Sequence, residues 1–189
     1  MAPAHTTIPT RLLPATLRPV PATTGYVLGA YTAVQEAYPG ADPAQFLELL
    51  LEDTVVAVVT EGDGAPEQLT VRGATEVERQ VREEQLQGWI EDFTRAGLNY
   101  QELIGGRLYE VAYDRELVAI ALLAEAELTA LLAQEPDRYY ATSRAAVARL
   151  DVHPLSASSA MSDEQIREQL AGHGAGVVFW SPDQHAWIS

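Results

Sequence analysis

The sequence predicts an α+β fold: one helix-dominated domain with a small mixed or antiparallel sheet, preceded by an extended arm. Three observations lead to this prediction. Capping signals begin several helices, one β-branched run is typical of a buried strand, and five of the eleven prolines fall within the first 24 residues. We therefore expect a proline-rich arm at residues 1–24, a single domain at residues 25–189, and a β-hairpin at the carboxyl end.

The arm is expected to be extended, because proline fixes φ and removes a backbone donor. Ordering such a segment costs about 1 to 2 kcal/mol of backbone freedom per residue, which only contacts can offset. We expect it to lie on its own domain or on a neighbouring subunit. A neighbouring subunit offers more groove for such a strip than a lone domain of this size, so we expect deletion of residues 1–24 to leave the domain folded and to weaken or abolish assembly. The apolar side chains available for these contacts are Ile8, Leu12, Leu13, Leu17 and Val20.

The first third of the domain is predicted to contain two helices and two strands. Residues 26–37 form the first helix, which ends before Pro39. Asp42, with Pro43 next and Gln45 beyond it, has the pattern of a helix start and leads into a leucine-rich stretch. The strands follow at residues 54–60 (TVVAVVT), apolar enough to be buried on both faces, and at residues 68–72.

The middle of the chain contains the clearest helical patterns. Thr75 and Glu78 form a capping-box pattern that begins an amphipathic helix reaching Ala96, and Gly97 ends it. We expect Trp89 to lie on the buried stripe of this helix. After a short strand at residues 108–113, Asp114 is expected to cap a long apolar helix.

That long helix is predicted at residues 115–134, and a further helix at residues 137–150. Ser162, with Gln165 three residues later, repeats the capping-box pattern and begins a helix that ends at Gly172. The chain is expected to finish in a β-hairpin formed by residues 177–181 and 185–188.

Charge and composition exclude several classes of partner. Twenty-seven carboxylates against twelve arginines, with no lysine, give a net charge of −15. Such a potential repels phosphate backbones and anionic lipid surfaces, so direct nucleic-acid or membrane partners are not expected. There is no cysteine, and therefore no disulfide or thiolate site. The apolar run at residues 117–124 is too short to span a bilayer, which needs about 20 residues.

No catalytic or metal-binding constellation emerges from the motifs, and no cofactor is predicted. Glu125 and Glu127 interrupt an apolar run, but residues two apart on a helix point in different directions, so a solvated face is favoured over a catalytic pair. The four histidines are His5, His153, His173 and His185, and none lies three or four residues from another, the spacing that places two ligands on one helical face. The sequence therefore leans away from an enzyme.

Aromatic residues gather near the carboxyl end. Phe179, Trp180 and Trp187 fall on the predicted hairpin, where alternation directs some side chains outward. They are either core residues or an exposed binding surface. Trp180 and Trp187 therefore join the apolar residues of the arm as candidate partner-binding residues.

Part of the domain resembles a known family. Two predicted helices, the strand around Val55 to Val59 and then Gly73 before a helix follow the order that begins the NTF2-like α+β barrels. The resemblance covers about a third of the chain and includes no catalytic motif. That group contains small-molecule isomerases, cyclases and scaffold domains, so the resemblance implies a pocket formed by a curved sheet. Because residues 115–172 are predicted to be helical, it supplies only the second of our functional hypotheses.

Two hypotheses follow from these patterns. The first is a non-enzymatic structural subunit of a larger protein assembly, homo- or hetero-oligomeric, for which a virion or phage particle is one setting. The second is a small-molecule enzyme or binding protein whose pocket lies between the sheet and the helix at residues 75–96. The sequence shows no secretory signal pattern, so we expect a location in the cytoplasm or within an assembled particle.

Overall fold

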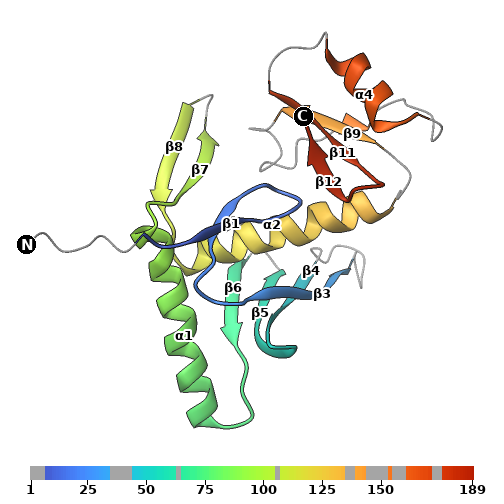
Figure 1. The fold of residues 1–189 in the computed structure, drawn as a ribbon. Coiled ribbons are helices and arrows are strands. Elements are labelled where there is room, and N and C mark those ends of the chain that lie inside the picture. Colours follow the sequence, from blue (N-terminus) through green and yellow to red (C-terminus); the bar gives the residue numbers. More distant parts are fainter. Residues whose placement is uncertain are drawn as a thin grey trace, which may run out of the picture. The chain divides into compact units, whose positions relative to one another are not determined.

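A computed structural model describes residues 7–34, 44–62, 65–104, 107–134, 139–143, 153–154, 161–171 and 176–189. The chain divides into two compact units (Figure 1). The first, which we call the N-terminal unit, comprises the residues up to Leu12 together with Pro19–Leu123, and the C-terminal unit comprises Leu13–Arg18 and Ala124–Ser189. Helix accounts for about 36% and strand for about 39%, so the chain is α+β without the predicted dominance of helices.

The proline-rich arm folds as a β-hairpin. Strand β1 (Thr10–Leu12) pairs antiparallel with β2 (Pro19–Pro21). The turn between them is closed by a hydrogen bond of 2.8 Å from the Leu13 amide to the Arg18 carbonyl. The arm therefore satisfies part of its backbone internally, although its prolines limit the hairpin to short strands.

A four-stranded antiparallel sheet forms much of the N-terminal unit. Its strands are β3 (Val27–Val34), β4 (Ala44–Leu51), β5 (Thr54–Gly62) and β6 (Ala65–Val71), and they lie in sequence order. Residues 56–59 of β5 are all buried, which confirms the prediction of a strand covered on both faces. The predicted returning strand at residues 68–72 corresponds to β6.

The two helices predicted before β5 are wrong, because both segments are strands. In β4, Leu47 and Leu49 are buried, whereas Phe46, the residue just before Leu47, is exposed. Buried side chains two residues apart follow the period of a strand and not the 3.6-residue period of a helix. Gly29 of β3 lies so close to Leu50 of β4 that a side chain there would collide with it. Pairing with neighbouring strands thus overrides the local helix signals, and the order of elements behind the NTF2-like resemblance is absent. Residues 35–43, which include the expected cap, lie outside the described residues.

Helix α1 (Glu76–Arg95) begins and ends as its sequence predicts. The Thr75 hydroxyl accepts a hydrogen bond of 3.1 Å from the Glu78 amide, while the Glu78 carboxylate accepts one from the Ala74 amide. At the other end Gly97 has φ +70°, and the Leu98 amide bonds to the carbonyl five residues earlier, as in a Schellman motif. Only the second half of the predicted apolar stripe is buried, through Leu86, Trp89, Ile90 and Phe93.

Two further strands and a long helix follow. Strand β7 (Asn99–Ile104), which the sequence did not predict, pairs antiparallel with β8 (Arg107–Ala112). The Asp114 carboxylate then accepts a hydrogen bond of 2.9 Å from the Leu117 amide and caps α2 (Arg115–Gln134), as predicted. Within the described part of the chain, no helix has both the length and the apolar character needed to cross a membrane.

The C-terminal unit contains a second sheet of four antiparallel strands. Their order is β10–β9–β11–β12. Strands β11 (Val177–Ser181) and β12 (Ala186–Ile188) form the predicted hairpin, and α4 (Asp163–Leu170) begins with the predicted capping box. The other two strands are β9 (Tyr140–Ser143) and β10 (His153–Pro154).

The prediction of a helix at residues 137–150 is wrong for the part of that segment that the structure describes. Residues 140–143 form β9, which pairs with β11 and β10, so sheet pairing again overrides a local helical pattern. Residues 137–138 and 144–150 of that segment lie outside the described residues.

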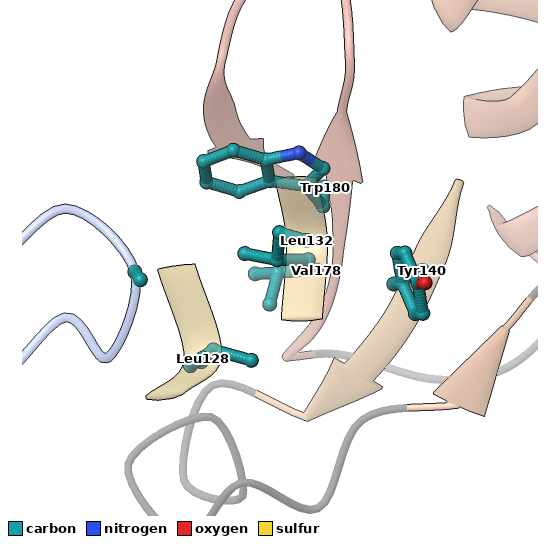
Figure 2. Packing of buried hydrophobic residues seen from close by; sticks show 6 residues of the cluster. Leu128, Leu132, Tyr140, Val178 and Trp180 are labelled. Carbon is teal, nitrogen blue, oxygen red and sulfur yellow. The ribbon is translucent and has the colours of Figure 1, made fainter. Parts of the chain in front are cut away.

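The core of the C-terminal unit joins α2 to this sheet. Figure 2 shows Leu128 and Leu132 of α2 beside Val178 and Trp180 of β11, with Tyr140 of β9 at one side. Ala15, from the turn of the N-terminal hairpin, belongs to the same cluster. A smaller cluster of Tyr139, Ile166 and Phe179 attaches α4.

Candidate interaction surface

The β7–β8 ribbon is a two-stranded sheet in which no other described strand takes part (Figure 1). All six residues of β8 are exposed, including three large apolar or aromatic ones. The exposed fractions are 57% for Leu108, 45% for Tyr109 and 45% for Val111. An isolated two-stranded ribbon is at best marginally stable in water. The ribbon therefore requires an anchor, and its apolar side chains are available to a partner.

A chain of aromatic rings anchors the base of the ribbon. The ring of Tyr100 in β7 meets that of Tyr113 edge-on at a centroid distance of 5.8 Å. Tyr113 packs at 4.4 Å on Phe93, which meets Trp89 at 5.2 Å. Phe93 and Trp89 are buried in α1. The base of the ribbon is thus attached to the core of the N-terminal unit, while β8 stays exposed along its whole length.

The chemistry of the ribbon suits an extended polypeptide. In an antiparallel pair, each strand directs about half of its backbone groups towards its partner and the rest outwards, where a third strand can bind them. Side chains alternate between the faces, so Tyr109 and Val111 share one face and Leu108 and Glu110 the other. Glu110 accepts a hydrogen bond of 3.0 Å from Gln101 across the ribbon. The face with Tyr109 and Val111 is the more apolar of the two.

The candidate residues of the arm have different environments. Leu13 and Val20 are buried, at 2% and 1% exposure, and Leu17 packs against the cluster shown in Figure 2. Ile8 is partly exposed. Leu12 is 53% exposed. Of the five apolar residues, Leu12 therefore offers the most surface to a partner.

The C-terminal aromatic residues belong largely to the core. Phe179 and Trp180 are buried, and Trp187 is partly buried beside Trp180, with ring centroids 5.7 Å apart. The Trp187 indole donates a hydrogen bond of 2.6 Å to the Ala15 carbonyl. These positions favour the core-packing interpretation of the cluster over an exposed binding surface.

A cleft of about 700 Å³ lies where the second hypothesis expects a pocket, between the sheet and α1. Strand β6, the first half of α1 and the start of α2 line it, with five glutamates and two arginines among the lining residues. One of them, Arg115, donates to the Leu69 carbonyl at 2.7 Å and forms an ion pair with Glu83. Most of the lining residues are exposed. The cleft lacks the deep apolar walls that are typical of enzyme pockets.

The glutamates of α2 differ from the expectation. Glu127 is exposed, as a solvated face predicts, but Glu125 is buried, with 1% exposure. Its carboxylate accepts hydrogen bonds from the amides of Ala15 and Thr16 and from the Thr16 hydroxyl. Three donors occupy this carboxylate, so its role is to hold the turn of the hairpin and not to transfer protons to a substrate. The sequence carried a signal for this burial, because Glu125 lies three or four residues from apolar residues such as Ala121 and therefore shares their face of the helix.

Asp163, at the start of α4, is a second carboxylate with several donors, and it is partly exposed. It accepts hydrogen bonds from the hydroxyls of Tyr139 and Ser181, at 3.1 and 3.0 Å, and from the Gln184 amide group at 2.7 Å. Burial, followed by this hydrogen bond and the charge of Asp163, raises the pKa of Tyr139 above its usual range. Asp163 therefore fixes the turn between β11 and β12.

Comparison of the chain with models of protein families, with curated proteins and with solved structures finds no match. The described residues also contain no group of three or more histidine, aspartate or glutamate side chains arranged to hold a metal ion. Two of the four histidines, His5 and His173, lie outside them. The exposed ribbon, the cleft and the charge of the chain are therefore the features that bear on its function.

Proposed function

We propose that this chain is a non-enzymatic interaction subunit of a larger protein assembly, and that it docks through the β7–β8 ribbon. The observation that carries the proposal is the exposure of every residue of β8 on a ribbon whose base is anchored by Tyr100 and Tyr113. A virion or phage particle is one setting that such a subunit would suit.

The apolar residues of the ribbon supply the driving force for docking. Burial of apolar surface contributes roughly 25 cal/mol per Å², and the outward backbone groups of β7 and β8 can pair with an extended strand of the partner. The fixed base reduces the freedom that the ribbon loses on binding. We infer a partner that contributes an extended strand with apolar side chains.

The charge of the chain favours a protein partner over nucleic acid. A net charge of −15 repels phosphate groups and attracts surfaces rich in arginine or lysine. We therefore expect the partner surface around the docked strand to be basic. Raised ionic strength would then slow association, because salt screens this attraction.

The test compares two double variants in the native assembly. Tyr109→Ser with Val111→Ser removes the apolar face of the ribbon, and Val77→Ser with Val81→Ser removes two exposed apolar residues of α1, at 73% and 49% exposure. Each variant, carrying an affinity tag, replaces the native chain in the source cells, and the mass of the complex that contains it is measured after purification.

We expect the ribbon variant to be recovered at the mass of the free chain and the α1 variant at the mass of the parent complex. Both should melt within a few degrees of the parent, since exposed substitutions change stability by about 0.5 kcal/mol or less. A parent chain recovered as a free monomer, or a ribbon variant that still assembles, contradicts the proposal.

The cleft between β6 and α1 favours a second candidate, a small-molecule enzyme or binding protein. The cleft has a volume of about 700 Å³, and its five glutamates would suit a cationic ligand. Spermidine serves as a probe. A saturable rise in melting temperature that Glu76→Gln reduces would support this candidate, and a rise that a matched concentration of sodium chloride reproduces would exclude it.

A further inference from the structure

A second cavity lies in the C-terminal unit and is unlike the acidic cleft. It has a volume of about 340 Å³, within the range of about 300 to 1,000 Å³ that small-molecule sites occupy. We call it the Trp180 pocket. Its lining residues are Pro14, Ala15, Thr129, Leu132, Ala133, Trp180 and His185.

The walls of the Trp180 pocket are largely apolar and carry no carboxylate or guanidinium group. Leu132 and Trp180 are buried members of the cluster in Figure 2, where the indole of Trp180 lies over Leu132. An indole face favours contact with a second aromatic ring. A cationic ligand would lose its hydration without gaining a carboxylate partner. The lining therefore suits a neutral aromatic compound.

The indole nitrogen of Trp180 adds a polar requirement. Trp89 donates to the Pro21 carbonyl at 3.1 Å and Trp187 donates to the Ala15 carbonyl at 2.6 Å. No acceptor among the described residues takes the N–H of Trp180, on a side chain that is 9% exposed. The nitrogen itself is not fully buried, so a ligand can reach it. A ligand that carries an acceptor can therefore bind this N–H, as backbone carbonyls bind those of the other two tryptophans.

The rim of the pocket is held in place by the turn between β11 and β12. The Gln184 amide donates to the Ser181 hydroxyl, which donates to Asp163. His185 follows in the left-handed region, with φ +48°, which histidine adopts more readily than most residues. Exposed His185 therefore has a fixed backbone position beside the opening, and the pocket is formed before any ligand arrives.

We propose that the Trp180 pocket binds a small neutral aromatic compound that carries a hydrogen-bond acceptor for the Trp180 indole. One or two fused rings match its volume. This site is independent of the β7–β8 ribbon, because the two belong to different compact units. Loss of assembly in the ribbon variant would leave it intact.

Coumarin, a neutral bicyclic compound with a carbonyl acceptor, is the probe, and naphthalene is the matched compound without an acceptor. Binding is followed in the full chain by nuclear magnetic resonance of the three indole N–H signals. We expect coumarin to shift the Trp180 signal saturably and to leave the Trp89 signal unchanged. Naphthalene should bind about three- to tenfold more weakly, since it lacks one hydrogen bond.

A pair of variants tests the location. Thr129→Phe places a ring in the pocket from an exposed position of α2, and Gln134→Phe adds the same ring at an exposed position that does not line it. We expect the first to abolish coumarin binding and the second to retain it. Ala133→Phe repeats the test if the first variant does not fold.

Two results overturn the proposal: no saturable shift of the Trp180 signal up to the solubility of coumarin, or an unchanged shift in Thr129→Phe. Equal affinity for coumarin and naphthalene overturns the assignment of the indole N–H as the donor.

Discussion

The carboxylate of Glu125 accepts hydrogen bonds from both the amide and the hydroxyl of Thr16, each 2.7 Å long, across 109 residues of sequence. The Ala15 amide donates a third, also of 2.7 Å. Trp187 donates to the carbonyl of the same Ala15. The donors of the hairpin turn therefore bind Glu125, and the Ala15 carbonyl of the same turn binds Trp187. A buried carboxylate is tolerated here because every bond to it is charge-assisted.

We expect Glu125→Gln to lower the free energy of unfolding by about 2 to 4 kcal/mol. The amide group of glutamine would face backbone N–H donors, and hydrogen bonds to a charged acceptor contribute about 1.5 to 3 kcal/mol each. Glu127→Gln, at an exposed position of the same helix, is the control and should change it by about 0.5 kcal/mol or less. Urea unfolding of both variants measures the difference, and equal midpoints would contradict this role for Glu125.

Trp89→Ala is expected to cost about 3 to 5 kcal/mol, the usual range for a large aromatic residue truncated in a core. Trp89 is 2% exposed, as predicted, and its ring meets those of Tyr26 and Phe93 at 5.0 and 5.2 Å. Trp89→Phe keeps an aromatic ring but removes the hydrogen bond to the Pro21 carbonyl, so it should cost less. A melting temperature for Trp89→Ala within a degree or two of the parent would contradict this placement.

The elements that the sequence predicted correctly are those whose signals are local. The caps at Thr75, Asp114 and Ser162 each lie within three residues of their partners, so a short window contains the whole interaction. Strand β5 was recognisable because residues 54–60 are rich in β-branched side chains and nearly continuously apolar. Strands β3, β4 and β9 were missed because their stability comes from pairing with segments elsewhere in the chain, and their own residues include strong helix formers.

In the candidate sites too, the sequence predicted local features but not contacts between distant segments. Residues 108–113 were predicted to form a strand, but nothing in their pattern shows that this strand pairs with β7 alone and stays exposed. The hydrogen bonds of Glu125 come from a turn more than a hundred residues earlier. The sequence predicted a pocket between the sheet and α1, but nothing in its patterns indicated that five glutamates would line the cleft there.

Alkaline pH should destabilise the chain through its buried tyrosines. Burial raises the pKa of Tyr26, and burial together with Asp163 raises that of Tyr139. Above pH about 10, the ordinary tyrosine value, the unfolded state binds fewer protons than the folded state, so the free energy of unfolding falls as pH rises towards the folded pKa values. Below pH about 10 both tyrosines are protonated in both states, so they do not make the free energy of unfolding depend on pH.

The composition of the chain makes this effect measurable. With no lysine and no cysteine, tyrosine is the side chain that titrates between pH 9 and about 12. Tyr139→Phe should reduce the slope of unfolding free energy against pH in that range, and Tyr109→Phe, at an exposed position, should leave it unchanged. Urea unfolding at several pH values, with tyrosinate absorbance as a second signal, gives both slopes. A Tyr139→Phe slope equal to that of the parent would contradict the raised pKa.

Two adjacent leucines decide whether the arm belongs to its own fold or to a neighbouring subunit. Leu13 is 2% exposed and Leu12 is 53% exposed, so the same substitution probes opposite environments. Leu13→Ala should cost about 2 to 5 kcal/mol, as a buried leucine usually does. Leu12→Ala should change the free energy of unfolding of the isolated chain by about 0.5 kcal/mol or less.

Deletion of residues 1–24 removes Leu13, Val20 and the donors to Glu125 together, so we now expect it to unfold the chain and not merely to weaken assembly. Thermal melting of the two leucine variants and of the truncated chain measures these effects without a partner present. If Leu13→Ala melts with the parent and the truncated chain stays folded, the hairpin does not stabilise its own fold. Its apolar side chains would then be free to bind a neighbouring subunit.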